Sequence, residues 1–132
     1  METVLVTGGA GFIGSHVVDL LIEKNYEVRV VDSLEGGSID NLNAHIKNSN
    51  LKFEKKDICN INNNAKIFNN VDYLFHFAGI GDIVPSIENP IKYFKNNVQG
   101  TISILDHATN NKIRKFVYAT SSSCYGIAKT PT

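Results

Sequence analysis

The sequence predicts an α/β protein: a doubly wound parallel β-sheet with helices packed on both of its faces. Three observations support this fold class. Apolar segments of strand length alternate with segments of helical periodicity along the chain. Several of the strand segments lack a polar face, which is typical of strands buried on both sides. A glycine-rich turn separates the first strand from the first helix. Right-handed crossovers then favour the strand order 3-2-1-4-5.

Five segments have the composition of strands. They are residues 3–6, 27–31, 51–55, 71–77 and 115–120. Each is short, and most are apolar and rich in β-branched or aromatic residues, which suits a strand better than a helix. The fourth segment is apolar enough to be buried on both faces, and the fifth runs into a bend rich in serine and threonine.

Two longer segments have helical periodicity. The first follows the glycine turn, and its buried face is expected to consist of Ile13, Val17, Leu20 and Leu21. The second is expected to begin at Asn89-Pro90, because Asn caps a helix and Pro suits its first turn. Its apolar stripe is Phe94, Val98, Ile102 and Leu105. A short helix is also expected near residues 42–47, and a weak helix or loop at residues 60–70.

Composition excludes several classes of protein. At 132 residues, of which 42% are hydrophobic, the chain suits a single domain covering residues 1–132. Its 13 basic and 13 acidic residues cancel and form no basic stripe for nucleic acid or an anionic membrane. No apolar run approaches the roughly 20 residues of a membrane span, and no signal peptide is recognisable. Cys59 and Cys124 are expected to be reduced, packed thiols, so we expect a cytoplasmic protein without a bound metal.

The turn after the first strand has the pattern of a dinucleotide-binding loop. Either Gly9 or Gly8 can open the pattern, and Gly11 and Gly14 complete it. One glycine permits a tight turn, Gly11 lets the backbone approach a pyrophosphate, and Gly14 lets the helix pack against the strand. The pyrophosphate would then face the free N–H groups at the helix N-terminus.

An acidic residue at the end of the second strand makes this pattern specific. Asp32 lies 21 residues after Gly11, close to the separation of about 20 expected for a carboxylate that binds the adenosine ribose. Such a carboxylate repels a 2′-phosphate, and the next residue, Ser33, which is also expected to border the cofactor, is not an arginine that could bind one. The sequence therefore predicts that the bound cofactor is NAD rather than NADP.

Four segments together resemble a known family. They are VTGGAGFIGSH near the start, VVDSLEGGSIDNL after the second strand, HFAGIGDIVPSIENP after the fourth, and FVYATSSSCYG at the fifth. In this order and spacing they resemble the extended short-chain dehydrogenase/reductase superfamily, which has a Rossmann fold. Within it they are similar to the NAD-dependent sugar-nucleotide epimerases and dehydratases of the UDP-glucose 4-epimerase type.

The resemblance implies roles for further residues. Phe12 and Ile13 match the part of the loop that covers the pyrophosphate. Asp57 and Ile58 match a pair that contacts adenine; without the resemblance, Asp57 would be interpreted as a solvated strand-end carboxylate. Three residues match the segment that lies along the cofactor: Phe77, Ala78 and Gly79.

The resemblance also assigns two polar residues farther along the chain. Asn97 matches an asparagine near the cofactor, with a plain helix-face amide as the alternative. Ser121 matches the catalytic Ser or Thr that hydrogen-bonds the sugar hydroxyl, because its register against Tyr125 and Gly126 selects it from a run of hydroxyl residues. Tyr125 itself is expected to pack rather than to catalyse.

The family's catalytic Tyr-x-x-x-Lys pair has no convincing match in this sequence. Tyr125 and Lys129 have the required spacing, but Tyr125 belongs to the family's serine-rich turn. We therefore expect the chain to end before that pair and to be the N-terminal, cofactor-binding part of the enzyme, without the C-terminal part that binds the sugar nucleotide. We expect no turnover from it alone.

The resemblance favours an epimerase that acts on a nucleotide sugar, most readily a UDP-sugar, and that makes precursors of surface polysaccharide. A nucleotide-sugar dehydratase is the first alternative, although that group usually has Asp-Glu after the catalytic position, where this chain has Ser122 and Ser123. A non-catalytic NAD-sensing module is the second. The helix after Pro90 commonly joins a dimer interface in this family, so we expect a homodimer of the whole enzyme and an adhesive apolar face here.

Overall fold

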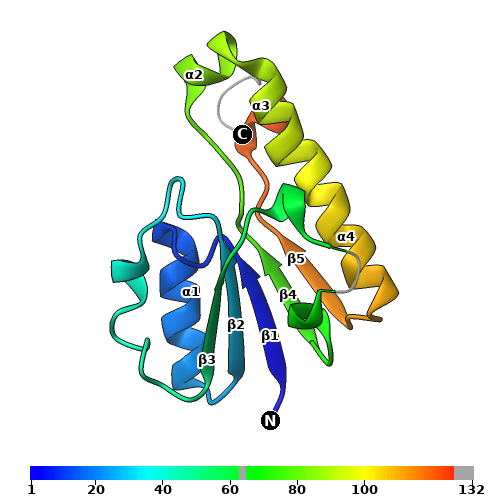
Figure 1. The fold of residues 1–132 in the computed structure, drawn as a ribbon. Helices are drawn as coiled ribbons and strands as arrows, with labels where there is room; N and C mark the ends of the chain where they lie inside the picture. The colour runs from blue at the N-terminus through cyan, green and yellow to red at the C-terminus, as the bar shows by residue number, and fades with distance from the viewer. Residues whose placement is uncertain (63–64, 127–132) are drawn as a thin grey trace.

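The computed structural model describes residues 1–62 and 65–126, and in this part the chain forms one parallel sheet. The strands are β1 (Thr3–Thr7), β2 (Glu27–Asp32), β3 (Leu51–Lys55), β4 (Tyr73–His76) and β5 (Lys115–Tyr118). Their order across the sheet is β3-β2-β1-β4-β5, and every pair is parallel (Figure 1). The predicted Rossmann fold and strand order are confirmed.

One face of the sheet is covered by helix α1 (Phe12–Glu23) and the short 3₁₀ helix η1 (Ile39–Leu42). Val4 and Val6 of β1 pack into this layer. The predicted buried face of α1 is partly wrong, because Ile13 and Leu20 are 63% and 50% exposed. The residues of α1 that are buried are Gly14, Ser15, Val18, Leu21 and Ile22. Small residues in the first turn let the helix approach the glycine turn closely, and hydrophobic periodicity does not register them.

The opposite face is covered by helix α4 (Thr101–Asn110) and by two short 3₁₀ helices, η2 (Ile58–Asn60) and η3 (Lys66–Phe68). Alternation along β1 sends Leu5 to this side, where it joins Leu74 and Ile104 in the second core. Helix α4 continues α3 (Pro90–Phe94) through a π-helical segment, η4 (Lys95–Gly100).

The predicted apolar stripe of this long helix lies on its outer face, where an adhesive surface was expected. Phe94, Val98, Ile102 and Leu105 are between 42% and 60% exposed. The buried residues are instead Gly100 in the π-helical segment and Ile104, His107 and Ala108 in α4. Gly100 packs so closely that a Cβ there would lie 2.6 Å from Ile58 Cδ1. The apolar residues of the predicted stripe are thus left on the outer face.

Several smaller expectations also change. The helix near residues 42–47 is replaced by η1 and turns, and β4 buries only Leu74 and His76 completely. A helix that was not predicted, α2 (Ile83–Glu88), follows β4. Within the described residues both cysteines are unpaired, as predicted, but both are exposed rather than packed. Tyr125 is 84% exposed, so the expectation that it packs is wrong, and Lys129 lies outside the described residues.

The direction in which the chain winds across the sheet reverses between β1 and β4. From β1 the chain winds toward β2 and β3, whereas β4 leads to β5 on the other side. In such sheets a crevice forms beyond the carboxyl ends of the strands at this point. The glycine turn after β1 and the segment after β4 meet there, and α2 rises above the same edge (Figure 1).

Candidate cofactor-binding site

The glycine turn is tight because it runs directly against the end of β4. Gly8 has φ of +70°, and a Cβ on it would lie 2.5 Å from Ala78 N. Its own N–H donates to Val31 O of β2 at 2.8 Å. A Cβ on Gly9 would instead meet Val30 Cγ1 at 2.7 Å in the core. Of the two ways to align the motif, the structure therefore favours the one that opens at Gly8.

The turn delivers the chain into α1 with its N-terminus open. A Cβ on Gly14 would lie 2.2 Å from Gly8 O, so the first turn of the helix rests on the loop. Gly11 is the N-cap, and among the described residues no side chain caps the helix. The first N–H groups of α1 are therefore available to an anion. A pyrophosphate-binding site requires such free donors.

The carboxylate of Asp32 is buried and holds two loops. One oxygen accepts a hydrogen bond from Ala10 N at 2.9 Å, and the other accepts from Leu34 N at 2.8 Å. The side chain therefore fixes the glycine turn relative to the loop after β2. Each carboxylate oxygen keeps a second lone pair, which suits a ribose diol as donor. The sequence predicts a contact of Asp32 with the ligand, but it does not indicate this structural role.

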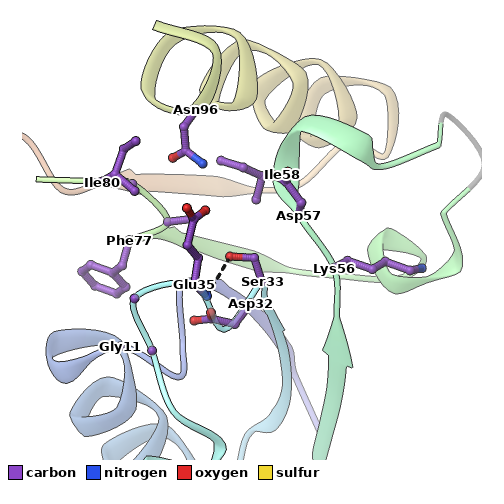
Figure 2. Close-up of a pocket in the computed structure, with 15 residues that line it drawn as sticks. Gly11, Asp32, Ser33, Glu35, Lys56, Asp57, Ile58, Phe77, Ile80 and Asn96 are labelled. Carbon is purple, nitrogen blue, oxygen red and sulfur yellow. Dashed lines mark hydrogen bonds between the residues drawn. The ribbon is translucent and has the colours of Figure 1, made fainter. Parts of the chain in front are cut away.

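A pocket lies between the glycine turn and the ends of β2, β3 and β4 (Figure 2). Most of the predicted cofactor-binding residues line it: Gly8, Gly11, Asp32, Ser33, Asp57, Ile58, Phe77, Ala78 and Gly79. Six further lining residues were not predicted: Glu35, Gly36, Gly37, Lys56, Ile80 and Asn96. The residues that line this pocket come from five separate chain segments, so it is a property of the fold and not of one motif.

Asp57 and Ile58 lie at the wall formed by η2. Asp57 caps this short helix, since its carboxylate accepts hydrogen bonds from Cys59 N at 2.9 Å and from Asn60 Nδ2 at 3.3 Å. Ile58 is 3% exposed and packs in the second core while one side reaches the pocket. The capping role is a third possibility for Asp57, and its contact with adenine stays a prediction.

A second pocket adjoins the first along the segment after β4. Ile13, Asn97 and Ser121 line it, and Phe77, Ala78, Gly79 and Ile80 line both pockets. Segment 77–80 is therefore their common wall. Phe12 belongs to neither pocket: it is 79% exposed and packs edge-on against His16, with ring centroids 5.2 Å apart.

Two consecutive asparagines of the π-helical segment serve different pockets. Asn97 Oδ1 accepts from Ile80 N at 2.9 Å, and its Nδ2 donates to Ile80 O at 2.8 Å. Asn96 lines the first pocket, and its buried Oδ1 has no hydrogen-bond partner among the described residues. A buried, unpaired amide oxygen at a pocket wall is poised to accept from a ligand. Asn96 was missed because nothing in the sequence separates it from its neighbour.

A buried histidine stands behind the common wall. His76, the last residue of β4, is completely buried, and it contacts the hydroxyls of Thr7 and Thr101. Burial lowers its pKa to about 4, so the imidazole is neutral at physiological pH. No role for this histidine is apparent from the sequence.

Charges around the first pocket are mostly acidic. Glu35 of the loop after β2 forms an ion pair with Lys92 of α3, which raises the pKa of the lysine. Figure 2 shows the Glu35 side chain rising from this loop toward Asn96. The carboxylates of this pocket suit hydroxyl groups of a ligand as hydrogen-bond donors. A phosphate group would instead be bound by the N-terminus of α1. Among the described residues no cluster of His, Cys, Asp or Glu could hold a metal ion, and no helix could span a bilayer.

The fold and the glycine turn define a Rossmann-type α/β domain with a crevice at the switch point. The chain belongs to the NAD-dependent epimerase/dehydratase family, whose model matches residues 4–132. It is 42% identical over 125 residues to a putative UDP-glucose 4-epimerase of Methanocaldococcus jannaschii, covering 93% of this chain and 39% of that one.

Solved structures are similar throughout the chain. A UDP-N-acetylglucosamine 4-epimerase from Methanobrevibacter ruminantium superposes with a TM-score of 0.91 at 36% identity, covering 99% of this chain and 42% of that one. A dTDP-glucose 4,6-dehydratase from Streptomyces venezuelae, solved with NAD bound, gives 0.91 at 33% identity, covering 99% and 43%. The chain thus spans about two fifths of the length of these relatives.

Proposed function

We propose that residues 1–132 are the NAD-binding part of a nucleotide-sugar 4-epimerase that acts on a UDP-sugar. The observation that carries the proposal is the pair of adjoining pockets, with Asp32 at one end, Ser121 at the other and segment 77–80 between them. An elongated dinucleotide and a sugar need such a two-part crevice. The family membership and the similarity to epimerases support the same conclusion.

The residues of the first pocket suit the adenosine half of NAD. Asp32 would accept from the ribose hydroxyls, and the open N-terminus of α1 would face the pyrophosphate. Asp57 and Ile58 would border the adenine, and the unpaired Oδ1 of Asn96 offers a further acceptor for an N–H of the ligand. The fit favours NAD over NADP, because a 2′-phosphate would meet the Asp32 carboxylate.

The second pocket would take the nicotinamide end and the sugar. NAD, when bound, supplies a hydride acceptor that makes oxidation and re-reduction of the sugar possible. The hydroxyl of Ser121 would orient the sugar hydroxyl that loses its proton. The base of this family is a Tyr-x-x-x-Lys tyrosine, which this sequence does not supply outside the Tyr125 and Lys129 spacing. We therefore propose that this chain binds cofactor but does not turn over UDP-sugars alone.

Fluorescence titration of the chain with NADH, with NADPH in parallel, tests the binding. NADH should bind more tightly than NADPH, and Asp32→Asn should weaken NADH binding by about tenfold, the loss of one charge-assisted hydrogen bond. Asp40→Asn is the matched control, since Asp40 lies in the next short helix and lines neither pocket. Equal affinity of all three proteins for NADH, or no binding, would contradict the proposal.

Turnover is tested separately with UDP-glucose and UDP-N-acetylglucosamine in the presence of NAD. We expect no epimerised product from the chain alone. Product formation above the background of a Ser121→Ala variant would overturn this part of the proposal.

A nucleotide-sugar dehydratase is the second candidate, because a dehydratase superposes as well as an epimerase does. The Ser-Ser sequence at 122–123 favours an epimerase, because a dehydratase is expected to have Asp-Glu at these positions. We further propose that the whole enzyme is a homodimer in the cytoplasm. The exposed apolar face of the long helix supports the dimer, and the two unpaired thiols fit a reducing compartment.

A further inference from the structure

The segment that separates the two pockets is held at both of its ends by side chains. At its start, Ala78 N donates to Thr7 Oγ1 of β1 at 3.4 Å, and Phe77 N donates to Thr7 O at 3.0 Å. At its end, the amide of Asn97 makes both hydrogen bonds to the backbone of Ile80. A loop that lines two pockets is thereby fixed from the sheet on one side and from the helix on the other.

His76 connects these two attachments. Its Nδ1 lies 2.6 Å from Thr7 Oγ1, and its Nε2 lies 2.9 Å from Thr101 Oγ1 at the start of α4. Thr101 Oγ1 in turn donates to the backbone carbonyl of Asn97 at 2.8 Å. One imidazole therefore bridges the strand that holds Ala78 and the helical turn that holds Ile80.

The directions of these hydrogen bonds form a consistent set. Because Thr101 Oγ1 uses its proton on Asn97 O, it must accept the N–H of His76 Nε2. Nδ1 then carries the lone pair and accepts from Thr7 Oγ1, which is free to accept from Ala78 N. Every polar atom of the network is paired in a single tautomer of a neutral imidazole, in a site closed by the rings of Phe116 and Tyr118.

We propose that His76 is a positioning residue: through Thr7 and Thr101 it fixes segment 77–80 at both ends and so sets the shape of the wall between the two pockets. The part of this inference that concerns ligand affinity rests on the proposed NAD-binding function, whereas the part that concerns the wall does not. Removal of the Thr101 hydroxyl should leave His76 Nε2 without a partner, shift the turn that holds Asn97, and loosen Ile80.

Thr101→Val tests the proposal, because valine keeps the shape of threonine and removes only the hydroxyl. Thr101→Ser keeps the hydroxyl and should therefore keep both the position of the wall and the affinity for NADH. Thr109→Val is the matched control: Thr109 lies on the same helix and its hydroxyl makes the same kind of bond to the carbonyl four residues earlier, Leu105 O at 2.9 Å, but it is exposed and lines neither pocket.

Two readouts are needed. Native-state hydrogen exchange of the Ile80 amide, which donates to Asn97 Oδ1, reports on the wall without any ligand. Its protection should fall about fivefold or more in Thr101→Val and should be unchanged in Thr101→Ser and in Thr109→Val. The Kd for NADH, measured by fluorescence with all variants folded, should rise about fivefold in Thr101→Val alone, which corresponds to about 1 kcal/mol.

The outcomes separate this inference from the proposed function. If Ile80 exchanges at the same rate in Thr101→Val and Thr109→Val, the positioning role of His76 is wrong. Equal losses in Thr101→Val and Thr101→Ser would also overturn it, because the hydroxyl would then not be the cause. If the unaltered chain does not bind NADH while the exchange pattern is as expected, the proposed function fails and the positioning of the wall stands.

Discussion

Lowering the pH from 7.5 to 5 should destabilise the chain through His76. The imidazole is completely buried, and burial lowers its pKa from the ordinary 6.5 to about 4. The unfolded chain therefore takes up a proton between these values while the folded chain does not. The stabilisation is fully present above pH 6.5 and is lost as the pH falls toward 4. The ring of Tyr118 stacks on the imidazole, and Cys124 lines the pocket that His76 borders.

The size of the effect follows from the two pKa values. The full difference corresponds to about 3 kcal/mol at pH values below both. At pH 5 the unfolded histidine is almost wholly protonated and the folded one is not, so about 2 kcal/mol should already be lost. This is a large part of the roughly 5–15 kcal/mol typical of a domain. Carboxylates with ordinary pKa values remain mostly ionised at pH 5, which separates their contribution from that of His76.

Urea denaturation at several pH values measures this loss, with His76→Asn as the comparison. The variant should be less stable at pH 7.5 but should show a much smaller decrease between pH 7.5 and pH 5. A titration of the imidazole by NMR in the unaltered chain gives the folded pKa directly and does not depend on the variant folding. An imidazole that titrates at 6.5 or above, or an unchanged pH dependence in His76→Asn, would refute the reasoning.

Three further expectations concern single side chains. Gly14→Ala places a methyl group 2.2 Å from Gly8 O and should lower the free energy of unfolding in urea by about 2 kcal/mol or more, whereas Gly36→Ala, with nothing described within 4 Å, should change it little. Asn96→Ala should raise the Kd for NADH several-fold without destabilising the fold, because its buried Oδ1 has no partner among the described residues; a loss of stability equal to that of Asn97→Ala would contradict this. Ile102→Lys should reduce self-association in sedimentation velocity, and Ile46→Lys, an exposed isoleucine remote from the long helix, should not; equal behaviour of the two variants would remove the long helix as the adhesive face.

The sheet could be predicted almost completely because its signals are local. Short apolar strands alternate with helical segments, and the right-handed crossover rule then determines the order of β3, β2, β1, β4 and β5. The turn between β1 and α1 could also be predicted, because a positive φ at Gly8 and the contact of Gly14 with Gly8 O each require a residue without a Cβ. These constraints fix the residue type at each position, so they can be recognised in the sequence.

The orientation of the helices could not be predicted as well. In the long helix, the large residues Phe94 and Ile102 are exposed, while Gly100 and Ala108 face the core. Hydrophobic periodicity indicates an apolar face but does not say whether that face meets the sheet or the outside. Close packing against Ile58 requires glycine at position 100 of the inner face, whereas most of the large apolar residues lie on the outer face. Ile13 and Leu20 of α1 were expected in the core for the same reason: their periodicity marks an apolar face but not the direction in which it points.

The two asparagines show what the motif alone leaves open at the site. The resemblance pointed to Asn97, whose amide oxygen and nitrogen each make one hydrogen bond to the backbone of Ile80, whereas Asn96 brings to the first pocket an oxygen with no partner among the described residues. The π-helical segment turns these neighbours toward different pockets, and neither spacing nor composition indicates such a turn. We therefore expect Asn96 to contact the ligand and Asn97 to support the wall, and the predicted position of Asn97 near the cofactor stays a prediction. Asn97, like Asp32 and His76, belongs to the framework that shapes the crevice, and a variant that loses cofactor affinity there need not have lost a contact with the cofactor.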